Sequence, residues 1–384
     1  MMDNTAFGID KVKGDIPVVS YFTGGGLLDI GFARAGFRVV WTNEHNNDFA
    51  EMYEFAIASM SKGQNTRRIS KRVSDRRSIQ DIQPYEIAQM AFPKGRPSLF
   101  GIIGGPPCPD FASGGKHKGS EGKEGHLSQV FVNHICSIKP SFFVFENVHG
   151  LLKTEKHRTF LEMLEHQLEE VNYCIDRRVL NSLDFGLAQD RARVFLVGIN
   201  INLVETCLGK KVDVSDRGWF PWPVMEKYNN AKERFKWPTC NADRDDCEKP
   251  EEIPNELTVF HLLSNIREDL PNAKEGFKPR SGKFQTVLEG DTSGKSFKKL
   301  HRFRYSPTAC YGNNEVHLHP WENRRLTVRE AMRIQGIPDD YALPSETSLT
   351  AKFKMIANGV PVPLAEQVAI SLSEFLRPLH QESR

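Results

Sequence analysis

The chain has 384 residues, of which 39% are hydrophobic and 26% charged, and its formal net charge is +2. This length can bury a sizeable core in about two domains, and the composition is that of a soluble globular protein. No apolar run approaches the roughly 18 residues of a membrane span, and residues 1–16 lack the apolar core of a signal peptide, so we expect a cytoplasmic protein without a membrane segment.

The first 200 residues alternate short apolar runs with amphipathic stretches of helical period. Strands that alternate with helices of this length predict an α/β fold with a doubly wound, mostly parallel sheet. The expected strands are residues 17–22, 37–42, 99–103, 141–145, 173–180 and 193–199, and the expected helices are residues 28–35, 48–60, 126–138 and 159–171.

The regular alternation stops near residue 200. Residues 205–320 are rich in Pro, Trp and Lys and have no strong period, and helical periodicity returns at residues 326–335 and 364–376. We therefore predict a first domain (1–205), a smaller irregular domain (206–350) and a C-terminal segment (351–384) that returns to the first domain.

Basic residues cluster in two segments. Residues 274–304 hold nine Lys or Arg against three acids, and residues 61–77 hold seven against one. Clusters of this size suit a polyanion such as nucleic acid, because neutralised phosphates release counterions. A solvated basic face is the alternative, and the composition does not separate the two interpretations.

A glycine-rich turn follows the first expected strand. Gly24 and Gly26 fit the start of a dinucleotide fingerprint, but Asp29 stands where that fingerprint needs its third glycine. Glu44 ends the next strand, twenty residues after Gly24, where a doubly wound fold places a carboxylate that binds ribose hydroxyls. The pattern favours an adenosine-type ligand over the alternative of a plain turn and a surface Glu.

Two chemical groups stand at the ends of later strands. Cys108 follows two prolines after the strand at 99–103, and Glu146 ends the strand at 141–145. A thiol and a carboxyl are the groups needed to add a nucleophile to an electron-poor ring and protonate it. A lone cysteine is more often a small buried hydrophobe, and a lone Glu is more often solvated. The seven cysteines form no Cys-x-x-Cys pair, so we expect neither a metal site nor a disulfide framework.

Six sets of segments stand in order along the chain: residues 22–26 with 29–32, 106–108 with 115–119, 146–148, 189–193, 325–331 with 335–339, and 358–361. In this order they resemble the motifs of the C5-cytosine DNA methyltransferases. The chain departs from the family's usual pattern at Leu27, Pro109, Ala112 and Ala357, and none of these changes removes a group that the reaction needs.

The resemblance implies a sheet of the S-adenosylmethionine-dependent methyltransferase type, with a smaller target-recognition domain. It also implies that Cys108 attacks C6 of a flipped cytosine, that Glu146 with a raised pKa protonates or hydrogen-bonds N3, and that Arg193 orients Glu146. Arg191 is expected to hold the base or a phosphate, and residues 113–125 to close over the base. The residues implied for S-adenosylmethionine are Phe22, Gly24, Gly26, Glu44, Pro106, Asn358 and Val360, with Ser78 or Asp81 at the third strand.

The implied partner is double-stranded DNA. The implied setting is a bacterial restriction–modification system with a cognate endonuclease. The enzyme is expected to act as a monomer in the cytoplasm, associated with the nucleoid through DNA. Base-contacting residues are expected within residues 215–320, among Arg280, Lys283, Gln285, Lys298, Lys299, Arg302 and Arg304. Three alternatives are a tRNA cytosine-5 methyltransferase, disfavoured because no Cys-Phe-Thr motif occurs, an inactive DNA-binding relative, and a nicotinamide dehydrogenase.

Overall fold

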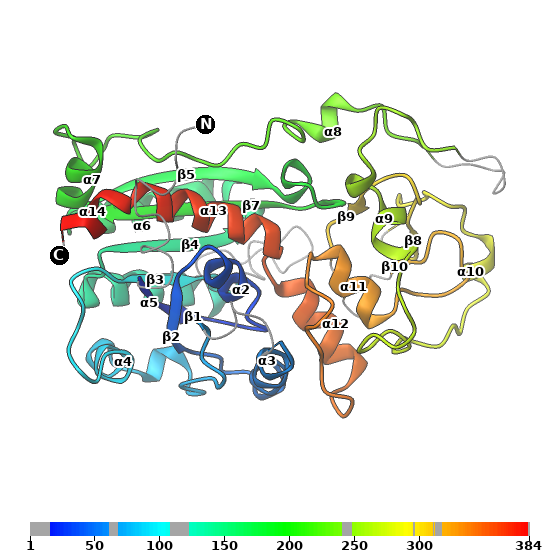
Figure 1. Ribbon diagram of the computed structural model, residues 1–384, viewed down its shortest axis with the longest axis horizontal. Coiled ribbons are helices and arrows are strands. Elements are labelled where there is room, and N and C mark those ends of the chain that lie inside the picture. The colour runs from blue at the N-terminus through cyan, green and yellow to red at the C-terminus, as the bar shows by residue number, and fades with distance from the viewer. Residues whose placement is uncertain are drawn as a thin grey trace.

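A computed structural model describes residues 16–60, 68–107, 123–239, 248–294, 296–309, 311 and 317–382. Its centre is a six-stranded sheet with the order β2-β1-β3-β4-β7-β5 (Figure 1). The strands are β1 (Pro17–Tyr21), β2 (Arg38–Thr42), β3 (Gly101–Gly104), β4 (Phe142–Val148), β5 (Tyr173–Asn181) and β7 (Ala192–Asn200).

The sheet is mostly parallel, as the alternation of strands and helices predicts. β2, β1, β3 and β4 pair in parallel, and β7 lies antiparallel between β4 and β5. The chain runs outward from β1 to β2 and then crosses to β3 on the other side of β1, so a topological switch point lies between β1 and β3. Open α/β sheets bind their ligands at the carboxyl ends of the strands beside such a point.

Both faces of the sheet are buried. Neighbouring residues along a strand point to opposite sides, and the residues of each side belong to a separate core cluster. In β3, Ile103 belongs to one core cluster and Ile102 to the other, and in β4, Val144 and Phe143 divide in the same way. The first cluster includes side chains of α2 (Leu27–Arg34) and α3 (Asn47–Ser59), and the second includes side chains of α4 (Pro84–Ala91), α5 (Lys123–Ile138) and α6 (Glu155–Glu169).

Helix ends follow local capping more closely than hydrophobic period. α3 begins one residue before the expected start, because the side chain of Asn46 accepts a hydrogen bond from the backbone N–H of Phe49 at 3.0 Å. α6 begins four residues earlier than expected, at Glu155, because Thr154 caps its N-terminus through the N–H of His157. The remaining elements of this half are η2 (Ile79–Asp81), η4 (His149–Leu152), η5 (Ser182–Phe185), β6 (Gln189–Asp190) and α7 (Ile201–Leu208).

The described elements between residues 209 and 334 are at most seven residues long, and Figure 1 shows most of them gathered at one end of the molecule. α12 (Leu349–Asn358) was not predicted from the sequence, and it begins where the Ser348 side chain caps it. The other elements are α8 (Ala231–Arg234), η6 (Asn255–Leu257), α9 (Val259–Leu263), α10 (Lys283–Thr286), β8 (Lys298–Lys299), β9 (Ser306–Pro307), β10 (His317–Leu318), α11 (Val328–Ile334), α13 (Val362–Phe375) and α14 (Arg377–Glu382).

α13 packs against α2, across more than 300 residues of sequence. A Cβ built on Gly31 would lie only 2.6 Å from the Cβ of Ala365, so the two helices approach closely because Gly31 has no side chain. Arg34 and Glu366 add an ion pair at 3.4 Å. Within the described residues, one helical stretch, Leu349–Phe375, is long and apolar enough for a membrane span, but 61% of its apolar window is buried, as in the core helices of soluble proteins.

Candidate active site

The glycine turn after β1 has a backbone that few side chains allow. Phe22, Gly24 and Gly26 have φ values of 54°, 54° and 77°. A Cβ on Gly24 would meet only the carbonyl oxygen of Phe22, at 4.0 Å, so the turn leaves open space on this side. Beneath it, the buried carboxylate of Asp29 accepts hydrogen bonds from Ser20, at 2.6 Å, and from Thr23. Asp29 belongs to the matching segment 29–32, but no individual role was predicted for this acid from the sequence.

Glu44 lies directly against this turn. Its Oε2 accepts a hydrogen bond from the backbone N–H of Gly24 at 2.9 Å, and its Oε1 accepts one from Asn46 at 2.7 Å. Burial raises the pKa of Glu44, and the bonds to Asn46 and Gly24 oppose that rise. The open space at Gly24 beside a fixed carboxylate fits a ligand with a hydroxylated ribose.

Ser78 and Asp81, the two candidates for a ligand contact near the third strand, come just after residues 75–77, which lie beside the end of β2. The side-chain amide of the buried Asn43 donates to the carbonyl oxygens of Asp75 and Arg77, both at 3.0 Å, and so holds this segment beside β2. Ser78 is half-buried and precedes η2, whereas Asp81 is exposed. The contact of Ser78 or Asp81 with the ligand stays a prediction.

Asn358 and Val360 come to the same region from the far end of the chain. A Cβ on Gly359 would lie 2.3 Å from the Cδ2 of Leu27, the residue after the glycine turn, so this backbone passes close to the start of α2. Val360 is buried and Asn358 is exposed. The two ends of the chain thus meet beside the turn, over a separation that no local pattern encodes.

Glu146 is a buried carboxyl within β4, which runs two residues past Glu146 and so further than the expected strand end. The Nε of Arg193 lies 3.1 Å from its Oε1, and both side chains are largely buried. Burial raises the pKa of Glu146, and the charges of Arg193 and Arg191 oppose that rise. A Cβ on Gly105 would lie 2.7 Å from Oε2 of Glu146, so the carboxyl group packs directly against the backbone that leads to Cys108.

Asn147 fixes the same backbone from the neighbouring position. Its side-chain amide donates to the carbonyl oxygen of Pro106 at 3.4 Å, and its Oδ1 accepts from the N–H of Val148 at 2.8 Å. Both Asn147 and Pro106 are buried. Cys108 and residues 109–122, which include most of the expected mobile loop, lie outside the described residues.

The guanidinium of Arg191 is fully buried and joins three parts of the chain. It donates to the carbonyl oxygens of Ala309 at 3.0 Å, Ala357 at 2.6 Å and Gly359 at 2.9 Å. Through these bonds Arg191 holds the 357–359 backbone beside the glycine turn. This structural role was not predicted from the sequence. The expected contact of Arg191 with base or phosphate stays a prediction.

Gln189 and Gln335 extend this connection. Gln189 donates to Gln335 at 3.0 Å and to the carbonyl oxygen of Ile334 at 2.7 Å, and it accepts from Ala309 at 3.1 Å. Gln335 donates to the carbonyl oxygen of Ile356 at 2.6 Å. All these groups are buried, where an unmade hydrogen bond is costly, so the network fixes how the two halves of the chain meet.

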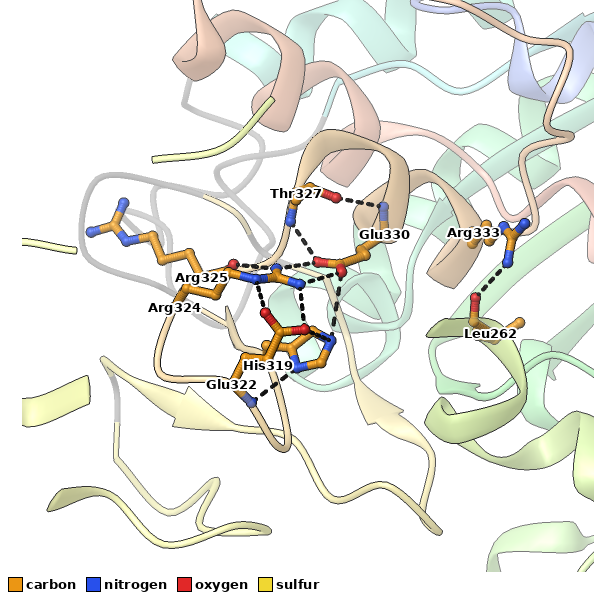
Figure 2. A network of polar contacts seen from close by, with 8 residues as sticks. All are labelled: Leu262, His319, Glu322, Arg324, Arg325, Thr327, Glu330 and Arg333. Carbon is orange, nitrogen blue, oxygen red and sulfur yellow. Dashed lines mark hydrogen bonds and ion pairs between the residues drawn. The ribbon is translucent and has the colours of Figure 1, made fainter. Parts of the chain in front are cut away.

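A second polar network lies at the base of α11 (Figure 2). Arg324 pairs with Glu330 at 2.7 Å and with Glu322 at 2.7 Å, and Glu330 also caps α11 by accepting from the N–H of Thr327 at 2.7 Å. His319 faces both carboxylates, yet burial lowers the pKa of His319 to about 4. Arg324, and not the imidazole, therefore supplies the positive charge that faces the two carboxylates at pH 7.

The expected base-contacting residues fall into two groups. Lys299 is buried, and Arg302 makes a bidentate pair with the buried Glu289, at 2.9 and 2.8 Å, so their charged groups face the protein interior. Arg304 lies over the ring of Tyr305, and Lys298 is half-buried. By contrast, Arg280, Lys283 and Gln285 are exposed in and beside α10.

Among the described residues, no group of three or more His, Cys, Asp or Glu side chains has the arrangement of a metal site.

Curated relatives are similar to this chain over most of its length. Type II methyltransferase M.NmeDI of Neisseria meningitidis serogroup C is 38% identical over 370 residues, which cover 96% of this chain and 86% of the relative. Type II methyltransferase M.FnuDI of Fusobacterium nucleatum is 29% identical over 94% of each chain.

Two solved structures share the fold. One is a putative DNA modification methyltransferase from an Escherichia coli prophage, with a TM-score of 0.62 and 20% identity, which covers 94% of this chain and 99% of that one. The other is the Schizosaccharomyces pombe Dnmt2 methyltransferase, with a TM-score of 0.58 and 12% identity, which covers 95% and 99%. The family model for C-5 cytosine-specific DNA methylases matches residues 16–374, and the chain belongs to that family.

Proposed function

We propose that this DNA cytosine-5-methyltransferase binds S-adenosylmethionine at the glycine turn. The open side of Gly24 would face the ligand, Glu44 would accept from the ribose hydroxyls, and Asn358 and Val360 would close the site from the second half of the chain. Phe22, Gly26 and Pro106 would complete its walls. The ligand supplies the methyl group of the reaction.

Cytosine C5 is a poor nucleophile until something adds to C6. We assign this addition to the thiolate of Cys108, which makes C5 an enamine carbon able to accept the methyl group. Loss of the C5 proton then breaks the bond between C6 and sulfur and restores the ring. Because C5 and C6 must be reached from above the ring, the cytosine must leave the stacked duplex, at a cost of a few kcal/mol.

One observation carries the proposal: Glu146 is buried against Gly105, three residues before Cys108, and paired with Arg193 at 3.1 Å. The raised pKa of Glu146 keeps a proton on it to higher pH than on an exposed Glu, which suits a group that donates to N3. Arg193 would orient the carboxyl group without contacting the ring. We keep Arg191 as a candidate contact to base or phosphate.

The substrate would be a short specific duplex sequence, with Arg280, Lys283 and Gln285 as the foremost base-contacting candidates because they are exposed. We also propose that methylation protects host DNA from a restriction endonuclease, since the relatives above are Type II methyltransferases. Exchange of residues 215–320 for those of a relative with a different target should change which cytosine is methylated. An unchanged target would mean that specificity lies elsewhere.

The test is incubation of the protein with S-adenosylmethionine and mixed-sequence duplex DNA, followed by bisulfite sequencing. Protected cytosines in one repeated context are expected from the wild type and none from Cys108→Ser. Cys108→Ser should still bind that duplex with nearly wild-type affinity, because the thiol adds only after the base is in place. Turnover by Cys108→Ser would refute the covalent route.

A further inference from the structure

A short stretch from the second half of the chain, residues 338–343, lies against the glycine turn. We call it the 338–343 segment. The hydroxyl of Tyr341, a fully buried side chain, donates to the carbonyl oxygen of Gly25 at 2.9 Å. A Cβ on Gly25 would lie 2.1 Å from the Sδ of Met355 and 2.9 Å from the hydroxyl of Tyr341. The turn is therefore tightly supported behind Gly25, whereas it is open at Gly24.

The same segment holds the end of α3. Ser59, the last residue of that helix, accepts a hydrogen bond from the N–H of Ala342 at 3.0 Å, and its hydroxyl proton is shared between the carbonyl oxygens of Ala56, at 2.7 Å, and Asp340, at 2.9 Å. The segment therefore contacts the turn at Gly25 and the C-terminal end of the helix that follows Glu44.

On its other side, the 338–343 segment is joined by hydrogen bonds to residues 271–272, which come just before the basic residues 274–304. Asn272 and the backbone of Leu343 exchange two hydrogen bonds, both of 2.9 Å. The buried guanidinium of Arg329 donates to the carbonyl oxygens of Pro271, at 3.0 Å, and Tyr341, at 2.6 Å. One short length of backbone thus connects residues 271–272 with the glycine turn.

We infer that the 338–343 segment couples the recognition half of the chain to the cofactor turn, with Tyr341 as the positioning residue that fixes the Gly25 carbonyl. This inference rests on the proposed function, since it takes S-adenosylmethionine to bind at that turn. Displacement of residues 271–272 would move the segment, and the segment would carry that movement to Gly25 through one buried hydrogen bond.

The first test is Tyr341→Phe, measured by titration with S-adenosylhomocysteine. Loss of one buried hydrogen bond at the turn should raise the dissociation constant about three- to tenfold. Tyr173→Phe is the matched control, because Tyr173 is equally buried and its hydroxyl donates to the carbonyl oxygen of Pro140, at 2.6 Å, away from the turn. Both variants should lose similar thermal stability, but only Tyr341→Phe should raise KM for S-adenosylmethionine, with kcat at saturation within about twofold of wild type.

The second test breaks the segment at its far end. Asn272 has φ 62°, which glycine adopts freely, so Asn272→Gly removes the bonds to Leu343 without straining the backbone. It should raise the same dissociation constant about two- to fivefold, less than Tyr341→Phe, because the lost bonds to Leu343 act on the turn only through the 338–343 segment. Asn230→Gly is its control, because Asn230 has φ 53°, is exposed and makes no side-chain cap at α8.

The outcomes separate the inference from the proposed function. A wild-type protein that fails to bind S-adenosylhomocysteine would refute the proposed cofactor site. A wild type that binds, with Tyr341→Phe equal to Tyr173→Phe or Asn272→Gly equal to Asn230→Gly, would refute the coupling and leave the cofactor site intact.

Discussion

Gly105→Ala is the substitution that tests most directly how Glu146 is held. The added Cβ would lie 2.7 Å from Oε2 of Glu146, whereas ordinary contact begins at 3.4 Å. The carboxyl group must therefore move by about 0.7 Å. It has little freedom to do so, because it is buried and Arg193 holds its other oxygen at 3.1 Å.

A displacement approaching 1 Å of a catalytic group can cost on the order of a hundredfold in rate. We therefore expect Gly105→Ala to lower kcat about ten- to hundredfold, which corresponds to roughly 1.4 to 2.7 kcal/mol of activation free energy. The assay is single-turnover methyl transfer to a duplex that carries the target sequence, with S-adenosylhomocysteine affinity measured alongside. Because Gly105 has no positive φ, the effect should come from the contact alone.

Gly276→Ala is the control, since its Cβ would meet no atom closer than 3.6 Å and the backbone there is ordinary. It should transfer methyl groups at nearly the wild-type rate. If Gly105→Ala also reacts within about twofold of this control, the carboxyl position does not limit the chemistry and the reasoning fails.

Three further changes test other parts of the site. Glu44→Gln leaves a single acceptor for the N–H groups of Gly24 and Asn46, so the dissociation constant of S-adenosylhomocysteine should rise about three- to tenfold by calorimetry; an unchanged constant would exclude Glu44 from the site. Arg191→Leu strands three buried carbonyl oxygens and should lower the free energy of unfolding by about 3 kcal/mol in urea; a loss below about 0.5 kcal/mol would contradict the structural role. Burial lowers the pKa of His134 to about 4 from an ordinary value near 6.5, so the folded state binds fewer protons than the unfolded one between these values and stability falls as pH drops. Acidification from pH 7 to 5 should therefore cost the wild type about 2 kcal/mol more than His134→Asn, and equal losses would contradict the assignment.

The sequence alone predicted the strand and helix alternation, which the structure confirms, and it supplied the chemistry proposed for the site. A short continuous apolar run marks a buried strand wherever its partner lies, and the motifs around Cys108 and Glu146 are contiguous. The antiparallel direction of β7 was beyond such reasoning, because a buried strand has the same residue pattern in either direction. α12 was not predicted, although the Ser348 cap at its start and the apolar Leu349, Phe353 and Ile356 at helical spacing are local signals.

Only the tertiary structure shows which polar side chains are buried in contacts within the protein and which are exposed. Lys299 and Arg302 have the same composition signal as Arg280, and the burial of Lys299 and the pair of Arg302 with the buried Glu289 separate them from it. Arg191 and Tyr341 act on carbonyl oxygens more than 150 residues away in sequence, at Ala357 and Gly25. Local sequence fixes which groups are available, but long-range packing fixes which of them meet, because a hydrogen bond depends on a few tenths of an ångström that no residue spacing encodes.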